Sequence, residues 1–254
     1  MSRTRTLAIR LISLAGVLTA WELYGRSVNP ILFTYPTAIS RAFLEVTRSG
    51  ELQSYLGQSL EVLSYALLLS VTVGIPAGVL LARFRTLELA TDFYINALYS
   101  TPMVALVPLI VLWFGFRVPA KVVVVFLFMI FPILINTQQG VKNVDRSLLE
   151  VARSFCSTER QLWVDVVLPS ALPFITAGLR LAIGRGLVGM IIAEFYTSIA
   201  GLGYMIVRYA NSFETAKLFV PIVVLMMMGV LLVQVARALE LWIAPWQRRG
   251  RGEL

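Results

Sequence analysis

The sequence predicts an all-α protein that crosses a membrane six times. Hydrophobic residues make up 58% of the 254 residues and charged residues only 14%, whereas a soluble domain holds about 45–50% and about 25% of these classes. Six apolar runs follow one another, and lysines and arginines collect near alternate ends of them. Because cytoplasmic segments carry the excess of basic residues, this pattern places both termini in the cytoplasm.

The first apolar run covers residues 11–24 and follows three arginines. Counted from Leu7, it approaches the ~20 residues that a membrane span needs. A secretory signal peptide also has a basic start and an apolar core, so it is the alternative. The run ends in Trp21 and Tyr24, an interfacial anchor rather than a cleavage site with small residues. We therefore expect a transmembrane helix here, within an N-terminal segment of residues 1–34.

Residues 35–58 form a polar, broken segment outside the apolar runs. Within it, Ile39, Ala42, Phe43 and Val46 recur with helical spacing, and charged residues occupy the other positions. This spacing predicts a short amphipathic helix in the outer membrane interface.

The next three spans are predicted at residues 60–81, 97–114 and 122–136 within a membrane core of residues 59–239. Pro76 interrupts the first of them, and Pro102 is expected to kink the second. Proline is tolerated in membrane helices when neighbouring groups satisfy the freed backbone. The last two spans begin near Pro173 and near residue 218. The first of these is rich in small residues that allow close helix packing, with one stripe made of Gly178, Ala182, Gly186 and Met190.

A polar segment at residues 150–169 separates the fourth span from the fifth. Two capping boxes are predicted, one at Ser147 with Glu150 and one at Thr158 with Gln161. They indicate two short helices that are broken near Cys156 and stopped by Pro169. The whole cytoplasmic loop is expected at residues 140–172, and a basic cytoplasmic tail at residues 240–254.

This segment resembles the EAA loop of the integral-membrane subunits of ABC importers. The resemblance is carried by Glu150-Val151-Ala152, a small residue at Cys156, an aliphatic at Val166, and Leu168-Pro169. The spacing matches without a gap, and the departures are Val151 for alanine and Cys156 for glycine. The resemblance implies that this loop couples the membrane helices to ATPase subunits, through these residues: Glu150, Ala152, Arg153, Cys156, Thr158, Val166, Leu168 and Pro169.

Other stretches resemble the permeases of nitrate, sulfonate and taurine importers, among them Trp113-Phe114-Gly115, Ala193-Glu194-Phe195 and Gly201-Leu202-Gly203-Tyr204. The resemblance implies a type I ABC importer permease fold in the bacterial inner membrane. It also implies a second permease copy, an extracytoplasmic solute-binding protein and two cytoplasmic ABC ATPase subunits that hold ATP and magnesium. The resemblance implies a small anion as the transported solute, such as nitrate, a sulfonate or taurine. Bicarbonate, a pyrimidine or thiamine precursor and an aromatic carboxylate are alternative solutes.

Three charged residues are candidates for the transport path: Arg180, Arg185 and Glu194. A charge at membrane depth is costly and usually faces the interior of the bundle or a wet cavity. Either arginine could attract an anion, or each could pair with a carbonyl or an acidic neighbour and hold the bundle together. Glu194 fits an anchor or a gate support better than a ligand.

The composition argues against several other functions. The chain has one Cys and no His, which excludes a metal site built from these residues and removes the commonest general base. It has no glycine-rich phosphate loop that ends in Lys-Ser or Lys-Thr. We therefore expect no catalysis and no cofactor in this chain, and no basic patch for nucleic acid. A secondary transporter, a channel and a membrane enzyme remain as alternative classes.

Overall fold

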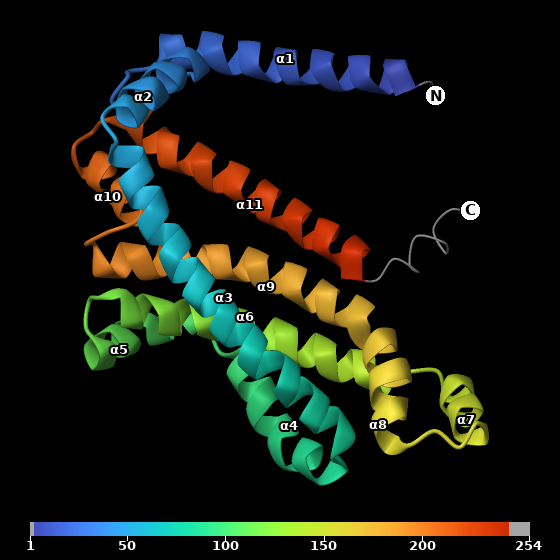
Figure 1. The fold of residues 1–254 in the computed structure, drawn as a ribbon. Helices are drawn as coiled ribbons and strands as arrows, with labels where there is room; N and C mark the ends of the chain where they lie inside the picture. Colours follow the sequence, from blue (N-terminus) through green and yellow to red (C-terminus); the bar gives the residue numbers. More distant parts are fainter. Residues whose placement is uncertain (1–2, 244–254) are drawn as a thin grey trace. The chain divides into compact units, whose positions relative to one another are not determined.

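The computed structural model describes residues 3–243, and all regular structure in this part is helical (Figure 1). The predicted tail from residue 244 onward lies outside the described residues. The contacts divide the described chain into two units, residues 3–59 with 198–226, and residues 60–197 with 227–243. Within residues 3–243, five helices are long and apolar enough to cross a membrane, and a bent pair would make six.

The first unit contains α1 (Arg3–Ser27), α2 (Pro36–Arg48) and α10 (Leu202–Asn211), with the first parts of α3 (Glu51–Arg83) and α11 (Thr215–Ile243). The predicted amphipathic helix is confirmed as α2, with Ile39, Ala42 and Val46 buried. Its apolar side packs with Leu202 and Met205 of α10 in one core. The α2 helix thereby becomes part of a small folded unit.

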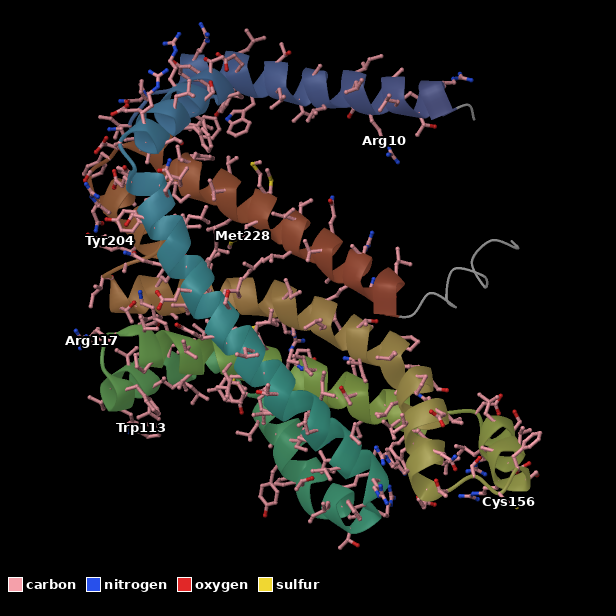
Figure 2. All side chains as sticks on the ribbon, in the orientation of Figure 1. Arg10, Trp113, Arg117, Cys156, Tyr204 and Met228 are labelled. Atoms are coloured by element: carbon pink, nitrogen blue, oxygen red, sulfur yellow. The ribbon has the colours of Figure 1, made fainter. Side chains whose placement is uncertain are left out.

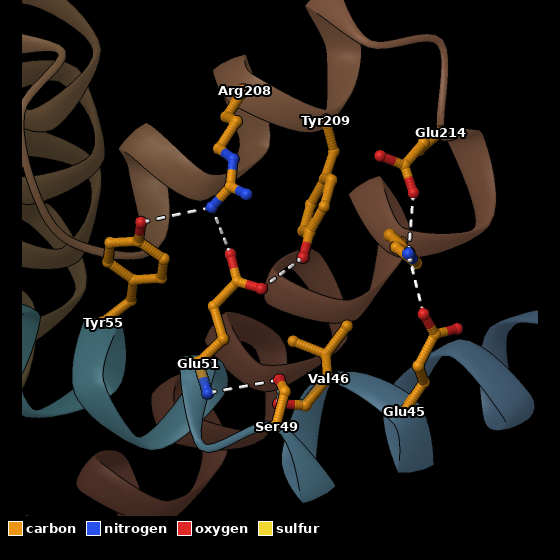
Figure 3. A network of polar contacts seen from close by, with 9 residues as sticks. Glu45, Val46, Ser49, Glu51, Tyr55, Arg208, Tyr209 and Glu214 are labelled. Carbon is orange, nitrogen blue, oxygen red and sulfur yellow. Dashed lines mark hydrogen bonds and ion pairs between the residues drawn. The ribbon is translucent and has the colours of Figure 1, made fainter.

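Polar side chains reinforce this first unit (Figure 3). Glu51, at the start of α3, pairs with Arg208 and accepts a hydrogen bond from the Tyr209 hydroxyl at 2.9 Å. The Lys217 ammonium lies 2.9 Å from Glu45 and 2.8 Å from Glu214. These contacts tie the beginnings of α3 and α11 to α2 and α10.

The second unit is organised around α6 (Val118–Lys142) and α9 (Leu168–Thr197), which pack along each other (Figure 1). Glycines on both helices allow this approach. A Cβ atom on Gly178 would lie 2.7 Å from Asn136 Cβ, and one on Gly140 would lie 2.7 Å from Phe174 Cβ. Gly186 and Gly189 are equally close to α6 side chains. The predicted role of small residues in close packing is thus confirmed at Gly178 and Gly186, and Gly189 joins them.

One predicted span is wrong in its form. In place of a kinked helix at residues 97–114, the chain forms α4 (Arg85–Ser100) and α5 (Met103–Phe114), which meet at 95°. Thr101 is extended, with ψ 133°, because the ring of Pro102 disfavours helical geometry in the residue before it. The break therefore places non-helical backbone between two apolar helices.

The other spans extend beyond their predicted limits. The α3 helix passes through Pro76 without a break, and α6 continues to Lys142. The fifth span begins well before Pro173, since a helical stretch runs from Glu159 to Thr197. Hydropathy marks only the apolar part of each helix, whereas its polar ends continue the same hydrogen-bond pattern.

Candidate functional site

The polar segment after α6 begins with a short amphipathic helix, α7 (Arg146–Ser154). Asp145 caps it, with its carboxylate accepting a hydrogen bond from the Ser147 N–H at 2.9 Å. This contact lowers the pKa of Asp145, because the N–H stabilises the charged form. The predicted capping box at Ser147 and Glu150 is therefore wrong. A cap at Ser147 would start the helix at Leu148, whereas the helix already starts at Arg146.

The α7 helix ends in a left-handed turn at Cys156, which has φ 54°. The Cys156 N–H donates to the Arg153 carbonyl at 2.9 Å, and the Ser157 N–H donates to the Ala152 carbonyl at 3.2 Å. These two bonds form a Schellman motif, which usually has glycine at the left-handed position. Cys156 thus adopts the backbone that glycine favours, and the predicted break near this residue is confirmed.

The second predicted capping box is confirmed at Thr158 and Gln161, which start α8 (Glu159–Gln161). The Thr158 N–H donates to Gln161 Oε1 at 2.9 Å, and the Gln161 N–H donates to Thr158 Oγ1 at 3.4 Å. The loop therefore holds two capped helices with a defined turn between them.

The predicted stop at Pro169 is wrong, because the helix continues through it into the membrane span. A π-helix, η1 (Leu162–Val167), joins α8 to α9, with the Leu168 N–H donating to the Trp163 carbonyl. Pro169 has no N–H to offer the Asp165 carbonyl, and its ring would press on that carbonyl in an α-helix. The wider π turn just before Pro169 relieves this conflict and preserves a continuous helix.

Three exposed apolar side chains form a stripe on the first helix of the loop and its C-cap. Leu148 and Val151 of α7 and its C-cap residue Phe155 are spaced by three and four residues, and Phe155 is 81% exposed. Figure 2 places Cys156 at the tip of this loop. Ala152 lies partly buried beside the stripe. Leu148, Val151 and Phe155 are hereafter called the loop stripe.

The remaining coupling candidates divide into exposed and supporting residues. Glu150, Arg153 and Thr158 are exposed, and within residues 3–243 the Glu150 carboxylate has neither a hydrogen bond nor an ion pair. We expected Glu150 to anchor the loop through its capping box or a nearby arginine, and its carboxylate makes no such contact within the described residues. Val166 and Leu168 are half-buried in the stretch that joins the loop to α9.

The base of the loop contacts the end of α3. The Arg83 guanidinium lies 5.0 Å from the centre of the Trp163 ring and 4.0 Å from the Glu159 carboxylate. Lys142, at the end of α6, pairs with Glu88 of α4. These contacts join the base of the loop to α3, and they join the end of α6 to α4 within the same unit.

Two of the three path candidates have internal partners. Arg180 lies 3.3 Å from Glu240 of α11, whose side chain is buried, so this arginine serves an ion pair. Glu194 is fully buried, and the buried Lys121 of α6 is its electrostatic partner. Both pairs fit helix anchoring, the role that we expected for Glu194.

Arg185, in the middle of α9, has a different environment. It lines a cavity of about 450 Å³ together with Tyr99 and Thr101 from the α4–α5 break. An Arg185 guanidinium N–H donates to the Tyr99 hydroxyl at 2.7 Å, and the guanidinium lies 4.7 Å from the centre of that ring. Sequence reasoning missed Tyr99, although an aromatic residue just before a Thr-Pro break in an apolar run is a usable signal.

The family model described as binding-protein-dependent transport system inner membrane component matches residues 74–249. The chain belongs to this family. It is therefore a transport component rather than an enzyme, and the EAA-type loop lies within the matched range.

Several curated proteins are similar to this member of the binding-protein-dependent transport family over most of their length. A putative aliphatic sulfonates transport permease of Bacillus subtilis is 33% identical and covers 94% of this chain and 87% of its own. A formylaminopyrimidine transport permease of Halalkalibacterium halodurans is 31% identical, and the match covers 92% of this chain and 93% of that permease. The Escherichia coli taurine transport system permease is 29% identical, over 97% and 91%.

Solved structures show the same fold at lower sequence identity. The MetNI methionine ABC transporter in an inward-facing conformation matches with a TM-score of 0.60 and 18% identity, over 74% of this chain and 94% of that one. An amino acid ABC transporter with histidines matches with a TM-score of 0.56 and 19% identity, over 82% and 98%. This family member therefore has the helical fold of ABC importer membrane subunits.

Proposed function

We propose that this chain is the permease subunit of an ABC importer that carries a small organic anion across the bacterial inner membrane. Two copies would form the pathway, two cytoplasmic ATPase subunits would bind ATP and magnesium, and an extracytoplasmic binding protein would deliver the solute. Membership of the binding-protein-dependent family and the sulfonate and taurine relatives support this assignment. A secondary transporter or a channel would need no surface for an ATPase.

The loop stripe is the observation that carries the proposal. An exposed apolar stripe on a short, doubly capped helix is a surface suited to a protein groove. Arg83, Trp163 and Glu159 fix the base of the loop, so it moves as a lever with the membrane helices. Closure of two ATPase subunits on bound ATP would then be transmitted to α9 through η1.

The proposed topology has six spans with both termini in the cytoplasm, and α4 with α5 together supply the third span. In this topology the loop at residues 140–172 faces the cytoplasm, and the segment at residues 35–58 faces the outside. The excess of basic residues in the predicted cytoplasmic segments supports this orientation. The segments at 1–34, 35–58, 59–239 and 240–254 keep their proposed roles of first span, outer segment, permease core and basic tail.

The single thiol makes the topology and the ATPase contact measurable together. Cys156 is exposed, so a membrane-impermeant maleimide should label it from the cytoplasmic face only. Bound ATPase should protect it, because Cys156 adjoins the loop stripe. Labelling from the outer face would overturn the topology, and cytoplasmic labelling that no ATPase affects would favour a channel or a secondary transporter.

A pair of variants tests the loop stripe directly. Val151→Asp, in the middle of the stripe, should abolish copurification of the ATPase and ATP-driven uptake while membrane insertion stays normal. Val164→Asp is the matched control, because Val164 is as exposed as Val151 but lies on η1 outside the stripe. Equal losses in both variants, or normal uptake in Val151→Asp, would contradict the proposal.

A further inference from the structure

The cavity at Arg185 holds a cation to which the described residues offer no counter-charge. Within the described residues, the contacts of the guanidinium are with Tyr99, as hydrogen bond and as ring contact, and no carboxylate pairs with it. By contrast, Arg180 has Glu240, and Lys121 has Glu194. An arginine at membrane depth without an acidic partner is costly, and such residues mark ion or substrate pathways.

The break between α4 and α5 points to the same cavity. Thr101 and Met103, on either side of Pro102, line it together with Tyr99. Non-helical backbone within a membrane is tolerated where it lines a cavity, and broken helices supply the binding sites of many transporters. The first turn of α5 has no side-chain cap, so its N–H groups add a favourable field for negative charge.

The rest of the cavity wall is apolar and aromatic. Leu127, Phe128 and Phe131 of α6 and Val188 of α9 face the same space as Arg185, and none of the lining residues is acidic. The volume of about 450 Å³ lies in the range of small-molecule sites. A ligand there would meet positive charge at one end and hydrocarbon elsewhere.

We infer that this cavity binds an organic monoanion with an apolar body, with Arg185 and the Tyr99 hydroxyl holding its sulfonate or carboxylate head. The inference rests on the proposed function and names the substrate class of that permease. An ammonium group on the body finds no acidic partner in the cavity and would lose its hydration. The site therefore selects an alkanesulfonate over a zwitterion such as taurine.

Binding of 1-propanesulfonate and taurine to the permease–ATPase complex in nanodiscs tests this inference. The two probes differ by a methyl group in place of an ammonium group, and omission of the binding protein removes its selectivity. Saturable binding of radiolabelled 1-propanesulfonate is expected, with taurine at least tenfold weaker. Arg185→Gln should weaken 1-propanesulfonate binding by about tenfold to a hundredfold, and Tyr99→Phe by about threefold to tenfold.

The control variant is Arg117→Gln, because Arg117 is an exposed arginine before α6 and outside the cavity. It should bind 1-propanesulfonate like the wild type. Unchanged affinity in Arg185→Gln, equal affinity for taurine, or no saturable binding by a complex that hydrolyses ATP would each overturn the inference and leave the proposed function standing. Failure of any ATPase to copurify would instead refute the proposed function, and 1-propanesulfonate binding would still be measured on the isolated permease.

Discussion

Replacement of Gly178 by alanine should destabilise the α6–α9 pair, whereas the same change at Gly184 should not. A Cβ on Gly178 would lie 2.7 Å from Asn136 Cβ and 2.8 Å from the Pro132 carbonyl oxygen. Carbon atoms pack best at about 3.5–4.0 Å, so α6 and α9 would have to separate locally by roughly 0.8 Å. A Cβ on Gly184 meets no atom of the chain within 4 Å.

The comparison of the two variants isolates the steric cost. Both gain the same helix propensity, about 1 kcal/mol for alanine over glycine, and this gain cancels in the difference. Overpacking costs about 1–3 kcal/mol, so Gly178→Ala should be less stable than Gly184→Ala by about 2 kcal/mol. For a chain of this size, that difference corresponds to roughly 4–8 °C in the unfolding midpoint.

Thermal unfolding in identical nanodiscs, followed by tryptophan fluorescence, measures the difference. The reasoning is refuted if Gly178→Ala unfolds at or above the temperature of Gly184→Ala. Gly186→Ala should fall between them, because its new Cβ would meet the side chain of Met129 rather than backbone.

Three further changes test other contacts. Cys156 has a left-handed backbone at φ 54°, which glycine adopts without strain, so Cys156→Gly should stabilise the end of α7 by up to about 1 kcal/mol. Cys156→Val should destabilise it. Hydrogen exchange of the loop amides would measure both changes. Arg180→Met removes one partner of the Arg180–Glu240 pair and leaves Glu240 buried and unpaired. It should therefore lower the unfolding temperature more than the double change Arg180→Met with Glu240→Leu. Burial and the hydrogen bond to Glu51 raise the pKa of Tyr209 from about 10 in the unfolded chain to about 12. The protonated tyrosine therefore contributes its full stability below about pH 10, and this contribution is lost as the pH rises to about 12. Tyr209→Phe should abolish this pH-dependent loss of stability in unfolding titrations.

Much of the fold follows from periodicity and hydropathy, because both report on which side chains are removed from water, in lipid or in a protein core. The α2 helix was predictable from the spacing of Ile39, Ala42 and Val46, and the Thr158 cap from its local sequence. The 95° bend at Pro102 was not, because proline also occurs at Pro76 and Pro132 inside unbroken helices. What distinguishes these cases is the packing around each proline, which local sequence does not contain.

The candidate sites show the same division. The EAA-type loop was recognised from its spacing, but the capping residue of α7 was misassigned. Asp145 and Ser147 are both good caps, and local sequence does not decide at which of them the helix starts. Arg180 and Arg185 were indistinguishable in the sequence. The structure separates them, because one meets Glu240 and the other meets Tyr99, both distant in the chain.

The π turn at residues 162–167 sets the rotational phase of the loop about the axis of α9. Each residue of an α-helix advances the chain by about 100°, and a π turn accommodates one residue more than an α turn. If the same residues adopted α geometry, α7 and α8 would be rotated by about 100° about that axis with every loop residue retained. The direction in which the loop stripe faces is thus set by the π geometry of this segment, because loss of one residue together with a return to α geometry would leave that direction unchanged.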